Sequence, residues 1–178
     1  MRLFTGIALP PSVLTTMGHV LDELRPTAVV KWSPIENLHI TCEFIGELPE
    51  ESLPGLVTEL REIPKRGNIA IGISGFGYFP NPHRPHSLYA GVHAGPELTA
   101  LARARAAGEP PPYMPHLTLA RIKNEDIRSL REHIASMTNF DFGSFEATQF
   151  HLYLSERGRT GSAYSIVGSF PLAPGAAV

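Results

Sequence analysis

The sequence predicts an α+β fold, and three patterns carry that prediction. Short apolar segments bounded by proline or glycine are typical of strands, and apolar residues spaced three or four positions apart are typical of helices. These segments are interleaved without the regular strand–helix–strand rhythm of a parallel sheet. The pattern His-x-Thr occurs at His39 and again at His116, each time in a predicted strand that a predicted helix follows. Such a repeat favours two related lobes that bring both segments to one central cleft.

The first half of the chain is expected to contain four strands and two helices. Strands are predicted at residues 3–9, 29–32, 38–44 and 69–73, and helices at residues 13–24 and 53–60. Ser12 and Ser52 are the predicted caps of these helices, because a serine hydroxyl can accept a hydrogen bond from a first-turn N–H group. Pro26 is predicted to end the first helix.

The second half is expected to contain four further strands and two helices. Strands are predicted at residues 88–92, 116–122, 145–154 and 164–170, and helices at residues 98–102 and 127–137. The last two strands flank a turn at Gly158 and Gly161 and are expected to form a hairpin. The whole chain, residues 1–178, is expected to be one domain with a frayed tail at 173–178.

The composition excludes several classes of protein. With 15 Lys and Arg against 17 Asp and Glu, the net charge of -2 argues against a surface that coats DNA. One cysteine excludes an internal disulfide framework and a multi-cysteine zinc site. No apolar run reaches the roughly 20 residues of a membrane span, and the N-terminus lacks a signal-peptide stretch, so we expect a cytoplasmic protein. Eight histidines direct attention to chemistry near neutral pH.

The repeated His-x-Thr pattern favours phosphoryl chemistry. Because side chains alternate along a strand, His39 and Thr41 are expected to share one face, as are His116 and Thr118. A neutral histidine can accept a proton from water while a protonated one gives a proton to a leaving oxygen. The hydroxyls can donate to phosphate oxygens as charge develops. This scheme requires no metal or other cofactor and predicts a bell-shaped pH–rate profile.

The residues alone also leave a structural interpretation open. A strand histidine is usually a surface or hydrogen-bonded residue, and threonine is common in strands. In a chain with eight histidines, two such pairs can also arise by chance. The shared strand context, rather than the pattern itself, is what makes a catalytic pair worth considering.

The residues around both histidines resemble those of a known family. Residues 31–46 read KWSPIENLHITCEFIG, and residues 115–121 read PHLTLAR. Both segments resemble the motifs of the two-histidine (2H) phosphoesterases. The likeness is specifically to the LigT-like branch, RNA 2′,3′-cyclic phosphodiesterases once described as 2′-5′ RNA ligases. It spans nearly the whole chain, including the opening strand, the Phe79-Pro80 loop and the closing hairpin.

The resemblance implies a bilobal fold in which two pseudo-two-fold-related lobes, each with an antiparallel sheet and flanking helices, surround a central cleft. It also implies metal-independent hydrolysis of a 2′,3′-cyclic phosphate, on an RNA end or a small cyclic nucleotide, to a 2′-phosphate. Carried over by position, His39 would be the proton donor to the departing 3′ oxygen and His116 the proton acceptor that activates water. These roles would exchange in the ligation direction. Thr41 and Thr118 would bind the phosphate.

Three residues close to the motifs are placed by the same alternation. Phe44 and Arg121 lie five residues after their histidines, so regular alternation turns them away from the cleft unless a bulge intervenes. Arg121 can then contact the phosphate or a base, or it can be a solvated surface arginine. Cys42 is expected on the core face, as a small buried hydrophobe and not a nucleophile.

Other chemistry-bearing residues have simpler interpretations. His83 and His86 lie on a proline-rich loop without an evident third ligand, so we expect exposed histidines there and no metal site. The glycine-rich run at 72–77 has no helix after it and is not expected to be a nucleotide loop. His151 is expected to be structural. Trp32 can either stack on a base or pack in the core.

The sequence thus predicts a monomeric hydrolase of RNA ends, without a membrane partner. Two other functions stay open. One is a binding module that holds an RNA end without turnover, which the intact histidine and threonine pairs weigh against. The other is a 2H enzyme that acts on another cyclic phosphodiester or on 2′-5′ linkages, which a comparison of rates across substrates would distinguish.

Overall fold

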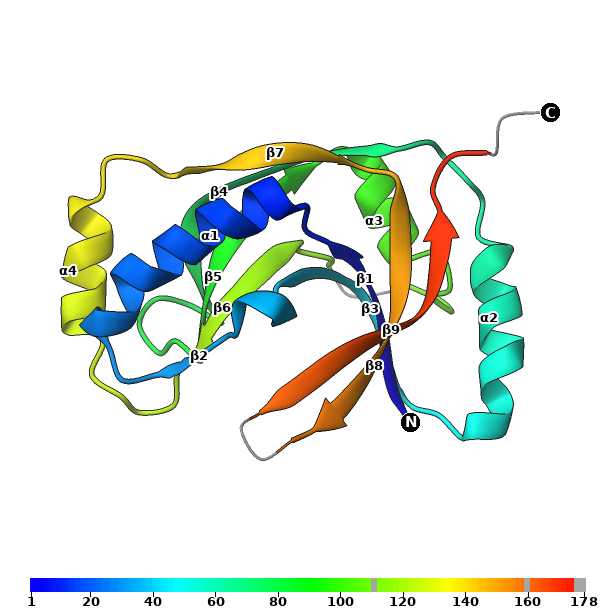
Figure 1. Cartoon of the computed structure of the whole chain (residues 1–178), viewed down its shortest axis with the longest axis horizontal. Coiled ribbons are helices and arrows are strands. Elements are labelled where there is room, and N and C mark those ends of the chain that lie inside the picture. Colours follow the sequence, from blue (N-terminus) through cyan, green and yellow to red (C-terminus); the bar gives the residue numbers. More distant parts are fainter. Residues whose placement is uncertain (110–111, 159–160, 175–178) are drawn as a thin grey trace.

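The computed structural model describes residues 1–109, 112–158 and 161–174, and these residues form two antiparallel sheets (Figure 1). The strands are β1 (Arg2–Ala8), β2 (Lys31–Trp32), β3 (His39–Glu47), β4 (Ile69–Phe79), β5 (Ser87–Ala94), β6 (His116–Arg121), β7 (Asp141–Ala147), β8 (Gln149–Arg157) and β9 (Ser162–Pro171). One sheet has four strands in the order β3-β1-β8-β9, and the other has five in the order β2-β6-β5-β4-β7. The predicted α+β class is confirmed.

Four α-helices in the described part of the chain divide between the two sheets. They are α1 (Pro11–Leu24), α2 (Leu53–Arg61), α3 (Pro96–Ala102) and α4 (Arg128–Ser136). Helix α1 packs against β7 and α4, whereas α2 packs against β9 and α3 against β3. Each sheet with its two helices is one lobe, named here the four-stranded lobe (α2, α3) and the five-stranded lobe (α1, α4), as Figure 1 shows.

The chain crosses between the lobes several times, so the lobes are intertwined. Strand β1 lies in the four-stranded lobe, but the helix that follows it packs on the five-stranded lobe. Two of the crossings lead directly into the His-x-Thr strands. Residues 33–38 pass from β2 in the five-stranded lobe to β3, and the segment between α3 and β6 passes in the opposite direction.

Two predicted strands differ from those in the structure. The single strand predicted at 145–154 is interrupted at Thr148 into β7, which pairs with β4, and β8, which pairs with β1. Buried residues on both sides of the break, Ala147 and Phe150, make the apolar pattern continuous although the chain changes sheets. The strand predicted at 29–32 is only Lys31–Trp32, and Val29 before it is exposed.

Of the two predicted serine caps, Ser12 is wrong because it lies inside α1, and Ser52 takes the predicted N-cap position but makes no capping hydrogen bond. Helix α1 begins at Pro11 with Pro10 as its N-cap, and α2 has Ser52 at the N-cap position without a side-chain hydrogen bond. Proline substitutes for a cap because it has no N–H group to leave unsatisfied and its φ angle already suits a first turn. Both helices have proline at one of their first two positions.

The interior of the molecule is one apolar cluster to which both lobes contribute. The apolar faces of the two His-x-Thr strands are part of it, since Ile40 and Leu117 are fully buried. No helix in the described ranges is both long and apolar enough to cross a membrane. Of the tail predicted to fray, residues 175–178 lie outside the described residues.

Candidate active site

The two His-x-Thr strands, β3 and β6, come from different sheets and lie against each other at the centre of the molecule. They line a cleft of about 750 Å³, and the residues that line it include His39, Thr41, His116 and Thr118. On each strand the residue after the histidine and the residue after the threonine are buried, as strict alternation predicts (Ile40, Cys42, Leu117 and Leu119). The structure therefore brings together the four residues that the sequence singled out.

Both histidine rings are held in the same way. The Nδ1 atom of His39 lies 2.7 Å from the Asn37 carbonyl oxygen, and Nδ1 of His116 lies 2.8 Å from the Met114 carbonyl oxygen. A carbonyl oxygen can only accept, so Nδ1 carries the proton in both rings and Nε2 remains for exchange with a substrate. In each case the carbonyl belongs to the residue two positions before the histidine, so the repeat includes the support of the ring.

Three aromatic rings adjoin His39. Its ring centroid is 4.7 Å from that of Phe4, 5.7 Å from that of Tyr153 and 5.2 Å from that of Tyr164. Burial lowers the pKa of His39; the bond with the Asn37 carbonyl opposes this effect, and the nearby charge of His116 adds to it. With His39 neutral, its Nε2 accepts a hydrogen bond from the Thr41 hydroxyl at 2.9 Å.

A β-bulge follows each motif and turns one further side chain into the cleft. The register between β1 and β3 skips Cys42, and the register between β5 and β6 skips Leu119, three residues after the respective histidines. A bulge reverses the alternation beyond it. Phe44 and Arg121, which regular alternation would turn away, therefore both line the cleft.

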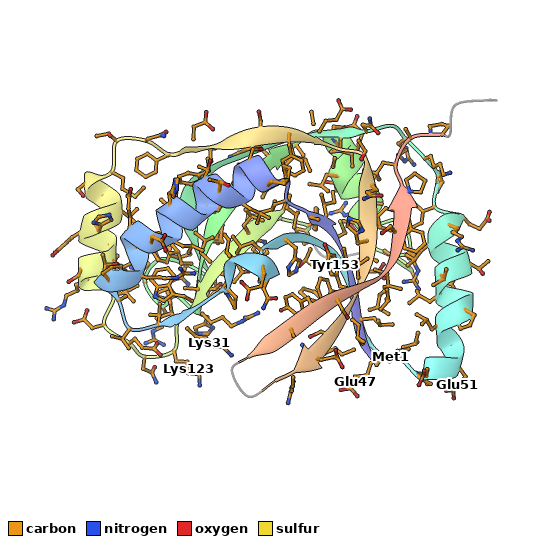
Figure 2. The ribbon with its side chains drawn as sticks, viewed as in Figure 1. Met1, Lys31, Glu47, Glu51, Lys123 and Tyr153 are labelled. Carbon is orange, nitrogen blue, oxygen red and sulfur yellow. The ribbon has the colours of Figure 1, made fainter. Side chains whose placement is uncertain are left out.

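The cleft is positively charged although the chain as a whole is not. Arg2, Lys31, Arg121 and Arg157 line it, and among the described lining residues there is neither aspartate nor glutamate. Figure 2 shows Lys31 beside β2 and Tyr153 among the strands of the other sheet. A cleft with this charge distribution suits an anionic ligand.

The remaining candidates do not join the site. His83 and His86 are exposed, and the described residues contain no group of three or more side chains able to hold a metal ion. His151 is buried and its Nδ1 lies 2.9 Å from the Ser169 hydroxyl, as expected for a structural residue. Cys42 is buried with its pKa raised to about 12, and a thiol that stays protonated is a poor nucleophile. The run at 72–77 lies within β4.

Sequence reasoning missed several residues that shape the site. Asn37 supplies the carbonyl that holds His39, and its side-chain amide donates to the Ser162 carbonyl at 2.6 Å. Tyr164 comes from β9 and meets the ring of His39 edge-on. Lys31, immediately before Trp32, lines the cleft with it. Asn37 lies two residues before His39, as Met114 lies two residues before His116, and this equivalent position was the one signal in the sequence. The other contacts depend on the tertiary fold.

Comparison with known proteins agrees with this architecture. Residues 7–89 and 95–164 match the family model described as LigT like Phosphoesterase. The chain is 31% identical over 183 residues to the RNA 2′,3′-cyclic phosphodiesterase of Aquifex aeolicus (strain VF5), covering 96% of this chain and 97% of that protein. It is also 31% identical over 159 residues to the RNA 2′,3′-cyclic phosphodiesterase of Archaeoglobus fulgidus, covering 85% of this chain and 89% of that one.

A solved structure has the same fold over its full length. A protein of Thermus thermophilus superposes with a TM-score of 0.77 and 28% sequence identity, covering 97% of this chain and 98% of that one. The bilobal arrangement expected from the sequence is consistent with this match. Family model, relatives and fold agree, and the chain belongs to the LigT-like phosphoesterase family.

Proposed function

We propose that this protein hydrolyses the 2′,3′-cyclic phosphate at an RNA end to a 2′-phosphate, with His39 and His116 as the acid–base pair. The observation that carries the proposal is the convergence of two Nδ1-anchored histidines, each with a threonine beside it, in one positively charged cleft. The names of the relatives from Aquifex and Archaeoglobus support the choice of substrate.

In the proposed mechanism, Nε2 of His116 accepts a proton from water as the water oxygen bonds to phosphorus. The bond between phosphorus and the 3′ oxygen breaks, and that oxygen takes the Nε2 proton of His39. The phosphate remains on the 2′ oxygen. Thr41 and Thr118 donate hydrogen bonds to the non-bridging oxygens, where charge increases in the transition state. For Thr41 this requires its hydroxyl to turn from His39 to the phosphate.

The lowered pKa of His39 has a direct consequence for this mechanism. In the empty cleft His39 favours the neutral form, which cannot act as an acid. A cyclic phosphate carries a negative charge, and an opposite charge within a few ångströms favours the protonated imidazole. Binding of the substrate is therefore expected to load His39 with the proton that it later gives to the 3′ oxygen.

The first experiment measures hydrolysis of an oligonucleotide ending in a 2′,3′-cyclic phosphate, with EDTA present. His39→Ala and His116→Ala should each lower kcat by about 10²- to 10⁴-fold, the usual range for general acid–base groups. His83→Ala, at an exposed histidine on a loop, is the matched control and should leave kcat unchanged. A requirement for a divalent metal, or full activity of the double variant, would refute the mechanism.

A second experiment assigns the two roles. Replacing the 3′ bridging oxygen of the substrate by sulfur gives a leaving group that departs without a proton, because a thiol is far more acidic than an alcohol. If His39 is the donor, His39→Ala should regain at least 10-fold on this substrate, while His116→Ala should not. The opposite result would make His39 the acceptor. A panel with 2′-5′ linkages and other cyclic phosphodiesters, measured in parallel, tests the choice of substrate.

A further inference from the structure

Two hydroxyl groups outside the His-x-Thr motifs hold the crossing segments at the motif threonines. The Tyr113 hydroxyl donates to the Thr41 carbonyl at 2.8 Å, and the Ser33 hydroxyl donates to the Thr118 carbonyl at 2.8 Å. Tyr113 lies in the segment that leads into β6, but its bond reaches β3. Ser33 lies in the segment that leads into β3, but its bond reaches β6, where it continues the pairing of β2 with β6. Each crossing segment is thus anchored to one motif strand and leads to the histidine of the other.

These bonds are located where each motif strand is irregular. The carbonyls of Thr41 and Thr118 belong to the residues immediately before the bulged Cys42 and Leu119. A bulge disrupts the regular ladder, and a buried carbonyl without a partner is costly. Each bulge also turns a further side chain into the cleft, so it cannot be removed without changing the site. A hydroxyl from the other segment satisfies the carbonyl while the bulge is kept.

The same bonds fix the reacting groups. Thr41 accepts the hydrogen bond of Tyr113 at its carbonyl, and the hydroxyl of the same Thr41 contacts Nε2 of His39. Ser33 holds β6 twice, because its backbone N–H also donates to the Leu119 carbonyl at 2.8 Å. The two strands come from different sheets, so the separation of His39 from His116 depends on contacts between lobes and not on a shared ladder.

We propose that Tyr113 and Ser33 are positioning residues that set the relative placement of the two halves of the acid–base site. The proposal rests on the proposed function for its kinetic readout only. An in-line displacement requires water and leaving oxygen on opposite sides of the phosphorus, so both histidines must be placed together. Because a misplacement of about 1 Å can cost about 100-fold in rate, the loss of either hydroxyl should reduce kcat far more than it reduces binding.

The test removes one oxygen atom at a time. Tyr113→Phe and Ser33→Ala should each lower kcat by about 5- to 50-fold while KM changes less than threefold. Tyr78→Phe, whose hydroxyl has no hydrogen-bond partner among the described residues, and Ser136→Ala, whose hydroxyl donates to the His133 carbonyl away from the cleft, are matched controls and should keep wild-type kcat. Ser33→Thr keeps a hydroxyl and should recover most of the loss.

A double-mutant cycle separates positioning from general destabilisation. In a His39→Ala background, Tyr113→Phe should lose most of its effect on kcat, because the ring that it positions is gone. In a His116→Ala background, Ser33→Ala should lose most of its own effect for the same reason. Equal factors in every background, or unchanged kcat in both single variants, would overturn the proposal.

The NMR chemical shifts of the histidine rings, recorded with and without inorganic phosphate, provide a readout that does not need turnover. Tyr113→Phe should change the phosphate-induced shifts of the His39 ring and leave those of the His116 ring, and Ser33→Ala should do the reverse. If wild-type protein hydrolyses no cyclic phosphate, the proposed function fails, but these shifts still test the positioning residues. Unchanged shifts of both rings in both variants would overturn the positioning role even with activity intact.

Discussion

Gly6 of β1 lies directly against the first His-x-Thr strand, and Gly6→Ala tests whether this close packing places His39. A β-carbon at this position would lie 2.8 Å from the Ile40 carbonyl oxygen and 3.4 Å from Cδ2 of His39. Carbon–oxygen contacts between strands are about 3.3 Å at their closest, so β1 and β3 must separate by roughly 0.5 Å. The atom that is too close belongs to the backbone, so no side-chain rotation relieves the contact.

The expected magnitude follows from this displacement. Overpacking of a well-packed interior costs about 1–3 kcal/mol of unfolding free energy, or roughly 2–12 °C in Tm for a chain of this size. A misplacement of about 1 Å can cost about 100-fold in rate, so a separation of roughly 0.5 Å predicts a loss in kcat of about 10-fold. Gly72→Ala on β4 is the control: the nearest atom to its β-carbon among the described residues lies 4.0 Å away, so neither quantity should fall.

Urea unfolding gives the stability change and steady-state hydrolysis gives kcat for both variants. Two results would refute the reasoning. If Gly6→Ala is as stable as Gly72→Ala, the strands accommodate the methyl group and the close approach is not a constraint. If stability falls but kcat does not, the separation of β1 from β3 does not reach His39.

Four further predictions concern titrating, charged and aromatic side chains. Since an anionic substrate raises the lowered pKa of His39, the alkaline limb of the kcat profile should lie at higher pH than that of kcat/KM; coincident limbs would count against His39 as donor. Burial also lowers the pKa of His151, so as pH falls below about 6.5 the unfolded state binds this proton before the folded state does, and the free energy of unfolding should decrease. His151→Asn should make the free energy of unfolding, measured in urea at pH 5 to 7, depend less on pH. An unchanged pH dependence would contradict this prediction. Arg121→Ala should raise KM about 10-fold and reduce the salt dependence of kcat/KM, whereas Arg128→Ala, at an exposed helix residue, should do neither. Phe44→Leu should weaken a nucleotide substrate by about 5- to 100-fold but leave an abasic ribose cyclic phosphate unaffected, if this exposed ring stacks on the base.

Alternation along strands was sufficient to predict the centre of the site. His39 and Thr41 fall on one face of β3 because one residue separates them, and the buried Ile40 confirms the direction of that face. The same rule fails five residues beyond each histidine. Cys42 and Leu119 look like ordinary core residues in the sequence. The sequence therefore does not show that the strand pairing skips both of them.

Contacts between segments far apart in the chain were beyond the reach of a local pattern. Tyr113 and Ser33 look like ordinary loop residues, and their roles arise only because the chain crosses from lobe to lobe twice. The interruption at Thr148 is similar. The apolar residues continue across it in the sequence, and only the pairing of β7 with one sheet and β8 with the other reveals it.

The repeat is symmetric in its acid–base groups and asymmetric in what surrounds them. Equivalent positions after the two bulges hold Phe44 on the His39 side and Arg121 on the His116 side. Aromatic rings adjoin both histidines, Phe4, Tyr153 and Tyr164 at His39 and Phe79 and Tyr89 at His116, so the difference lies in the residues after the bulges.

The exposed ring of Phe44 suits the nucleoside, and the guanidinium of Arg121 suits the phosphate. The 3′ oxygen belongs to the nucleoside, so a substrate bound in this orientation directs its leaving oxygen to His39 and opens the opposite face of phosphorus to water at His116. Under the proposed function, the difference after the two bulges favours His39 as donor although its lowered pKa favours the neutral form. The orientation of the substrate would select the histidine, and the charge of the substrate would then favour its protonated form.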